Sequence, residues 1–109
     1  MTKRYEVVFT PRALRQLDHL YTTIADDSGA VRASNYVGKI VETCQSLSLF
    51  PERGTTRSDL RPNLRTMGLA KRLTIAFSVN HADGTAAIHG VFYGGQDFES
   101  VLRETISDE

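Results

Sequence analysis

The sequence predicts an α+β domain in the order β-α-α-β-β-β, in which a hairpin of two helices packs on one face of an antiparallel sheet. Two stretches in the first half repeat apolar residues at helical spacing, whereas the second half alternates apolar and polar residues as β-strands do. An Asp-Gly turn separates the last two alternating stretches. A chain of 109 residues has room for one core, so residues 1–109 are expected to form a single domain.

The chain opens with a short strand followed by a capped helix. Apolar residues alternate from Tyr5 to Phe9, which predicts the strand. Thr10 is a favourable N-cap and Pro11 is favoured at the first helical position. Gly29 is expected just after the last turn of this helix. The expected apolar positions are Ala13, Leu14, Leu17, Leu20, Tyr21 and Ile24.

A second helix is expected from Val31 to Leu49, with Pro51 ending it. The short turn between the two helices predicts that they pack antiparallel. The single cysteine, Cys44, falls on the apolar face, so we interpret it as a core residue in a reducing, cytoplasmic setting. The other apolar positions are Ala33, Tyr36, Val37, Ile40, Val41 and Leu47, with Phe50 at the margin.

Three apolar stretches then predict three strands. Leu64–Leu69 is short, and Arg72–Val79 and Ala86–Tyr93 should form a β-hairpin around the turn at residues 81–85. The polar connection Pro51–Pro62 is longer than most loops, which raises the chance of a binding role. The last strand ends at two glycines, which allow a sharp change of direction at the rim of the sheet.

Composition excludes several functional classes. A balanced net charge and a 40% hydrophobic content are typical of a folded globular domain. No apolar run approaches the ~20 residues that a membrane span needs, so no membrane partner is expected. His19, His81 and His89 lie far apart, and no metal-ligand spacing or phosphate-binding glycine loop is present. The sequence therefore predicts neither a metal nor a cofactor.

Positive charge is concentrated in the middle of the chain and negative charge at its end. The basic residues are Arg53, Arg57, Arg61, Arg65, Lys71 and Arg72. This pattern indicates an anionic partner, either nucleic acid or an acidic protein segment, or else local pairing with the acidic tail. Arg65 and Arg72 lie in or beside strands, where two guanidinium groups on one sheet face would hold a phosphate or carboxylate. The alternative is that they are surface arginines whose stems cover apolar area.

Segments spread over nearly the whole chain resemble toxins of the RelE/ParE superfamily. They are Tyr5–Ala13, Gln16-Leu17, Leu20-Tyr21, Ile24-Ala25, Tyr36–Ile40, Cys44–Leu47, Phe50–Gly54, Arg57, Leu64-Arg65, Arg72 and Gly90–Glu99. The resemblance implies the toxin of a bacterial type II toxin–antitoxin module with a RelE/ParE-like fold. It also implies a hetero-oligomer with a ribbon-helix-helix, ParD-like antitoxin, whose C-terminal part adds a helix and an extended segment to the toxin. DNA would then be contacted only through the antitoxin.

The resemblance leaves two activities to distinguish. The RelE branch is a ribosome-dependent mRNA endoribonuclease, which needs a proton acceptor and positive charge at the phosphate. The ParE branch, which includes plasmid stabilisation proteins, inhibits DNA gyrase by binding it. This chain has Gln96 where the nuclease carries a basic residue, and Leu102 where many carry a tyrosine. The ParE branch is therefore favoured.

On this interpretation the chain has no catalytic residue. The predicted contacts with the antitoxin or gyrase are Arg57, Arg65, Arg72, Tyr93, Gln96 and Phe98. The nuclease alternative would use Arg65 and Arg72 with His89 or Tyr93. A third reading is a degenerate toxin that keeps only its antitoxin-binding role.

Overall fold

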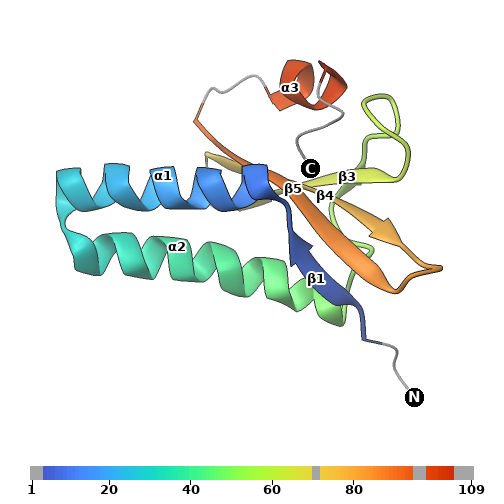
Figure 1. Ribbon diagram of the computed structural model, residues 1–109, viewed down its shortest axis with the longest axis horizontal. Helices are drawn as coiled ribbons and strands as arrows, with labels where there is room; N and C mark the ends of the chain where they lie inside the picture. The colour runs from blue at the N-terminus through green and yellow to red at the C-terminus, as the bar shows by residue number, and fades with distance from the viewer. Residues whose placement is uncertain (1–3, 70–71, 95–97, 105–109) are drawn as a thin grey trace.

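The computed structural model describes residues 4–69, 72–94 and 98–104 and confirms the α+β class (Figure 1). The elements are β1 (Glu6–Phe9), α1 (Pro11–Ser28), α2 (Ala30–Gln45), the 3-10 turn η1 (Ser46–Ser48), β2 (Thr55–Thr56), β3 (Leu64–Leu69), β4 (Leu73–Asn80), β5 (Thr85–Tyr93) and α3 (Phe98–Glu104). The predicted order is present, with β2 and α3 as additions. In Figure 1 the two long helices run side by side in opposite directions, as predicted.

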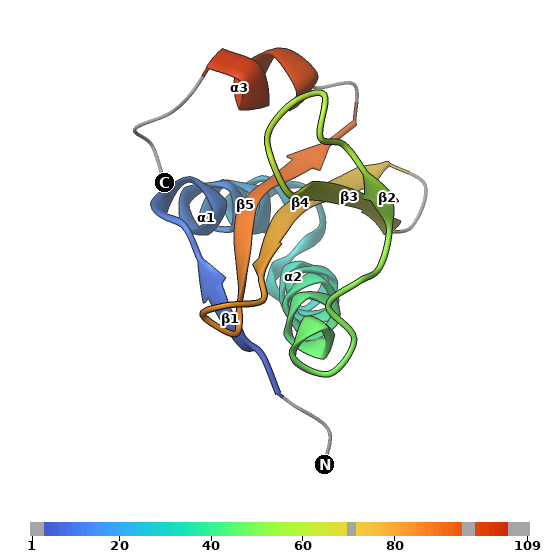
Figure 2. The ribbon, with the colours of Figure 1, turned by 90° about the vertical axis from the view of Figure 1, so that its right-hand side faces the viewer.

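The five strands form one sheet in the order β1-β5-β4-β3-β2. The β4–β5 hairpin is antiparallel, as predicted, and so are the pairs of β3 with its neighbours. The expectation of a wholly antiparallel sheet is wrong at β1, which pairs parallel with β5 through Val7↔Ala86 and Phe9↔Ile88. The alternation of apolar and polar residues along a short strand does not predict which edge of the sheet the strand joins, or whether it pairs parallel or antiparallel there. Here the chain leaves β1 through both helices, and β5 later runs beside β1 in the same direction (Figure 2).

The ends of α1 follow from local chemistry. The side chain of Thr10 accepts a hydrogen bond from the backbone N–H of Ala13 at 3.2 Å, and Pro11 occupies the first turn. Gly29 has a φ of 96° and donates to the carbonyl of Ala25 at 3.0 Å. Both predicted boundaries of α1 are therefore confirmed.

The second helix ends earlier than expected. α2 stops at Gln45, because the hydroxyl of Ser46 donates to the carbonyl of Thr43 at 2.5 Å and the chain tightens into the 3-10 turn η1. Pro51 lies several residues beyond this end. Phe50 is 65% exposed and therefore does not extend the apolar face.

The main core lies between the helical hairpin and the sheet. Its buried members are Ala13, Leu17, Leu20, Ile40, Cys44, Leu47, Leu73, Ile75, Phe77, Val79, Ala86, Ile88 and Val91. Leu14, expected on this face, is 54% exposed because it lies at the margin of the buried stripe. Burial raises the pKa of the Cys44 thiol to about 12, which agrees with a packing role.

A smaller core lies on the opposite face of the sheet, under α3 (Figure 2). It comprises Leu60, Leu64, Ala76, Phe92 and Leu102, with Phe98 and Val101 packed against it. The sequence did not predict α3, which has only seven residues. Within the described residues, no helix combines the length and the apolar character that crossing a bilayer requires.

Candidate partner-binding site

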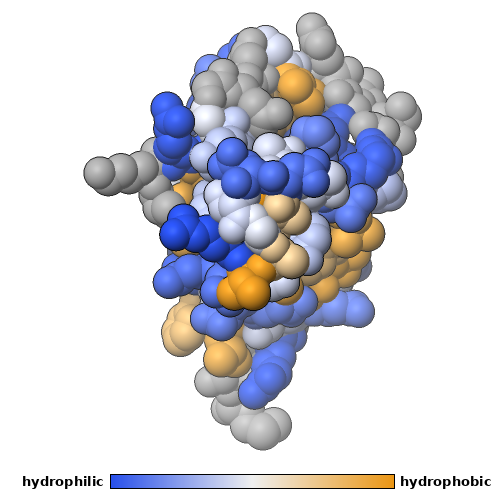
Figure 3. Space-filling view, turned by 90° about the vertical axis from the view of Figure 1, so that its left-hand side faces the viewer, coloured by the Kyte–Doolittle hydropathy of each residue, from blue (hydrophilic) through white to orange (hydrophobic). Residues whose placement is uncertain are grey.

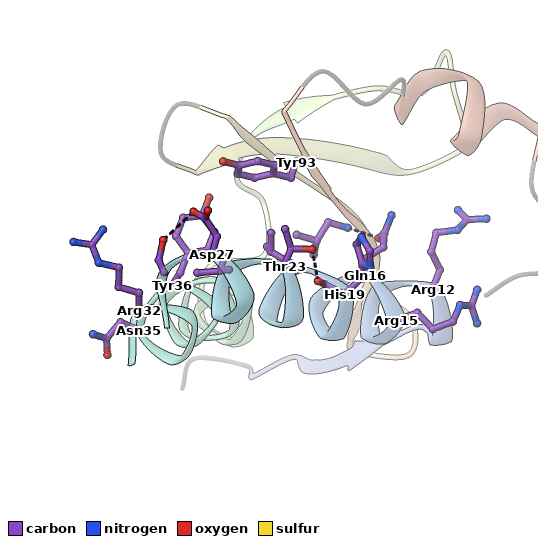
Figure 4. Close-up of a pocket in the computed structure, with 14 residues that line it drawn as sticks. Arg12, Arg15, Gln16, His19, Thr23, Asp27, Arg32, Asn35, Tyr36 and Tyr93 are labelled. Carbon is purple, nitrogen blue, oxygen red and sulfur yellow. Dashed lines mark hydrogen bonds between the residues drawn. The ribbon is translucent and has the colours of Figure 1, made fainter. Parts of the chain in front are cut away.

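A groove of about 1190 Å³ runs along α1, between the helical hairpin and the end of β5 (Figure 4). Its charged and ionisable walls come from Arg12, Arg15, His19, Asp27 and Arg32, and its apolar surface from Leu20, Ile24, Tyr36, Val91 and Tyr93. Three of these residues are arginines, and among the described lining residues only Asp27 is acidic. The described lining therefore combines apolar area with more basic than acidic side chains, although Arg12 is only 6% exposed, and an acidic, amphipathic segment would complement this composition.

The amino-acid spacing of α1 produces the charged wall of the groove. Arg12, Arg15, His19 and Thr23 recur every three or four residues and so share one face of the helix. The apolar stripe that begins at Ala13 faces the core instead. The sequence did not single out this polar stripe, although its helical spacing was a usable signal.

An aromatic pair closes one end of the groove. The rings of Tyr36 and Tyr93 meet edge to face, with centroids 6.3 Å apart and an interplanar angle of 76°. Burial, and secondarily the nearby Tyr93, raise the pKa of Tyr36 above its ordinary value. Tyr93 remains 42% exposed. In Figure 4 the Tyr93 ring lies over the groove, with Arg12 and Arg15 toward the other end.

The β5 wall contains a bulge. Phe77 pairs with Ile88 and Ala76 pairs with Gly90, which leaves His89 as an extra residue in the strand. The His89 Nε2 and the Ser78 hydroxyl lie 2.7 Å apart. The bulge sets the direction in which β5 continues toward Tyr93 at the groove.

The structure brings together two of the predicted site residues. Arg72 precedes β4, and its carbonyl accepts a hydrogen bond from the N–H of Gly94 at 2.7 Å, so its backbone lies beside that of Tyr93. Tyr93 lines the groove, whereas Arg72 does not. Arg65 lies elsewhere, because it pairs with Phe77, about 17 Å further along β4 at ~3.4 Å per residue. The hypothesis of a clamp formed by Arg65 and Arg72 is therefore wrong.

Two other predicted residues belong to the contacts of α3. Arg57 donates two hydrogen bonds of 3.0 Å to the carboxylate of Asp59 and one of 2.6 Å to Glu99. For Arg57, local pairing with an acidic residue near the C-terminus is thus the correct alternative. Phe98 is half-buried, with its ring centroid 5.9 Å from that of Phe92. Gln96 lies outside the described residues, so its predicted role stays a prediction.

The remaining ionisable side chains are dispersed. His81 lies 2.6 Å from the Tyr5 hydroxyl and 3.1 Å from a Glu52 oxygen, far in sequence from His19 in the groove. Within residues 4–69, 72–94 and 98–104, no group of histidine, cysteine and acidic side chains is arranged to hold a metal ion.

Comparison with known proteins decides the family. The family described as "ParE toxin of type II toxin-antitoxin system, parDE" matches residues 7–98. The chain belongs to this ParE toxin family. It is 32% identical over 77 residues to Toxin ParE3 of Caulobacter vibrioides, an alignment that covers 71% of this chain and 76% of the relative. The chain is thus a type II toxin of the ParE branch of the RelE/ParE superfamily.

Solved structures share the ParE fold of this chain. The chromosomal ParDE system from P. aeruginosa matches with a TM-score of 0.70 and 23% identity, over 84% of this chain and 97% of that one. The RelBE2 toxin–antitoxin complex from Mycobacterium tuberculosis matches with a TM-score of 0.63 and 20% identity, over 88% and 98%. A mutant of the E. coli toxin RelE matches with a TM-score of 0.65 and 14% identity, over 92% and 94%. At these identities the likeness concerns the fold alone.

Proposed function

We propose that this ParE-family toxin acts by binding DNA gyrase, without chemistry of its own. We further propose that a cognate ribbon-helix-helix antitoxin neutralises it by placing an acidic, partly apolar segment in the α1 groove. The observation that carries the antitoxin proposal is the composition of the groove. Arg12, Arg15 and Arg32 line the groove together with a single described acidic residue, Asp27, and the Tyr36–Tyr93 pair.

The two kinds of groove surface have different roles in this proposal. The arginines attract an acidic segment and fix its register, whereas the aromatic and aliphatic side chains supply apolar area for a helix. Aromatic residues and arginine are also the side chains that most often dominate binding energy. Antitoxin affinity should therefore depend on a few residues at the two ends of the groove.

Charge reversal in the groove tests this proposal. Arg15→Glu should weaken binding of the cognate antitoxin at least ~10-fold in isothermal titration calorimetry, because it places a carboxylate against an acidic partner. Arg72→Glu, beside Tyr93, should act in the same direction. The control is Val31→Ser, which changes an exposed apolar residue that does not line the groove. Affinities of all three variants within twofold of the wild type would contradict the groove assignment.

The nuclease alternative makes a different prediction in cells. A RelE-like enzyme produces new 5′ ends at ribosome-bound codons, which primer extension on transcripts from toxin-expressing cells detects. We expect none after expression of this toxin. New ends that disappear on substitution of His89 or Tyr93 would establish the nuclease alternative instead.

A further inference from the structure

A second exposed apolar site lies beyond the C-terminal end of α2. Leu49 is 40% exposed and Phe50 is 65% exposed, immediately after η1. The groove, by contrast, uses Arg32, Asn35 and Tyr36 in the first two turns of α2. An exposed Phe–Leu pair is therefore separated from the groove by most of the length of the helix.

Two arginines adjoin this apolar pair. The Nη1 of Arg53 donates to the hydroxyl of Ser46 at 2.6 Å, while the N–H of Phe50 donates to the carbonyl of the same serine at 3.2 Å. The Arg53 guanidinium and the Phe50 backbone thus bind the same serine. Arg65 in turn donates to the carbonyl of Arg53 at 3.2 Å.

The charges of these two arginines are not neutralised within the described residues. Arg53 and Arg65 donate to neutral oxygens, and neither has a described carboxylate within ion-pair distance. Arg57 differs, because Asp59 and Glu99 both bind its guanidinium. Guanidinium groups that bind only neutral oxygens remain available for an incoming carboxylate.

A small polar pocket of about 150 Å³ continues the surface. Arg65, Thr56, Ser58 and His81 line it with hydrogen-bonding groups, and the Glu52 carboxylate at its wall lies 3.1 Å from His81. The volume suits one side-chain carboxylate rather than a folded element.

We propose that the Phe50 surface, defined by Leu49, Phe50, Arg53, Arg65 and the adjoining pocket, is the toxin's contact with its target. This inference rests on the proposed function, in which the toxin acts by binding a protein. The occupant is a protein segment that places a large apolar side chain on Leu49 and Phe50 and a neighbouring carboxylate on Arg53 and Arg65. Charge complementarity together with the exposed aromatic ring favours such a segment over nucleic acid, whose phosphates would not use the apolar pair. Among the described residues, none lines both this surface and the groove.

The test compares three substitutions in the full-length toxin. Phe50→Ser removes the apolar anchor and Arg65→Gln removes a cation, whereas Val31→Ser makes the same kind of polar change at the hairpin tip. Figure 3 shows that this tip is mostly hydrophilic, with apolar residues in separate places. Thermal unfolding first establishes that each variant folds. The readouts are colony formation after induction without antitoxin, antitoxin affinity by calorimetry, and inhibition of supercoiling by purified gyrase.

We expect Phe50→Ser and Arg65→Gln to restore colony formation at least tenfold, with antitoxin affinity within twofold of the wild type, whereas Val31→Ser stays toxic. Toxicity equal to the wild type in both variants overturns the inference. Loss of toxicity in Arg65→Gln alone also overturns the inference, because dependence on the cation without dependence on Phe50 indicates phosphate binding. If toxicity depends on Phe50 and Arg65 but gyrase is not inhibited, the gyrase proposal fails and the surface assignment stands. A wild-type chain that neither arrests growth nor inhibits gyrase overturns both the gyrase proposal and the surface assignment.

Discussion

The side-chain oxygen of Gln16 accepts a hydrogen bond from the backbone N–H of Val91 at 2.7 Å, although the two residues are 75 positions apart. Gln16 lines the groove from α1, and Val91 follows the bulge in β5, where the regular ladder is interrupted. The side chain thus satisfies a backbone donor beside the irregularity. This contact fixes the two walls of the groove relative to each other.

Gln16→Ala should destabilise the fold by about 1–2 kcal/mol, because it leaves the part-buried N–H of Val91 without its acceptor. Gln16→Glu keeps an oxygen in the same place and serves as the matched control. Urea unfolding monitored by circular dichroism measures both variants. Equal stabilities of Gln16→Ala and Gln16→Glu would show that the hydrogen bond contributes nothing.

Gly90 is required at the bulge for steric reasons. A Cβ there would lie 2.5 Å from the ring of Phe92 and 3.1 Å from the Gln16 oxygen. We expect Gly90→Ala to cost about 1–3 kcal/mol through overpacking. Gly38→Ala is the control: Gly38 lies in α2 with nothing within 4 Å of the added Cβ, so the substitution should stabilise the helix by ~0.5–1 kcal/mol. Differential scanning calorimetry should show a lower Tm for Gly90→Ala and a higher Tm for Gly38→Ala. A Tm of Gly90→Ala that does not fall would contradict the packing argument.

The pKa of the Asp59 carboxyl lies below its ordinary value, chiefly because Arg57 donates hydrogen bonds to it. The folded state therefore binds fewer protons than the unfolded chain between the two pKa values. The contribution of Asp59 to stability is complete above the ordinary aspartate pKa, and it is lost as the pH falls through the lowered one.

Carboxyl carbon NMR titration measures this pKa directly. In Arg57→Met, which removes the donor, the pKa of Asp59 should rise toward the ordinary value. The unfolding free energy of Asp59→Asn should also fall less steeply than that of the wild type below about pH 4. An unchanged Asp59 pKa in Arg57→Met would refute the assigned cause.

Burial and the raised pKa of about 12 should make Cys44 unreactive in the folded protein. At pH 8 the folded thiol should react with a disulfide reagent at least ~100-fold more slowly than the same chain in denaturant, since the thiolate is the nucleophile. Absorbance of the released thiolate follows the reaction. Equal rates in the two states would mean that Cys44 is not enclosed by the core.

Local chemistry made much of the fold predictable. Thr10-Pro11 and Gly29 mark the ends of α1 because caps act within a few residues. The parallel pairing of Val7 with Ala86 depends on a tertiary contact that strand alternation does not encode. Likewise, α3 is stabilised by distant partners, since Leu102 is fully buried and Glu99 binds Arg57.

The site was predicted only in part. Of the residues predicted near the rim of the sheet, Tyr93 lines the groove, whereas Arg72 lies beside Tyr93 in the sheet without lining it. The groove itself forms where α1 approaches β5, so Arg12 and Arg15 line it only because of that approach. Their spacing along the helix was a usable signal for one shared face, but it gave no information on what lies opposite that face.

Supercoiling of relaxed plasmid by purified gyrase, measured against increasing toxin, tests the central claim most directly. The account predicts inhibition that follows the ratio of toxin to gyrase, that an equimolar amount of cognate antitoxin reverses, and that leaves RNA in the reaction intact. Full supercoiling activity in the presence of excess folded toxin would contradict it.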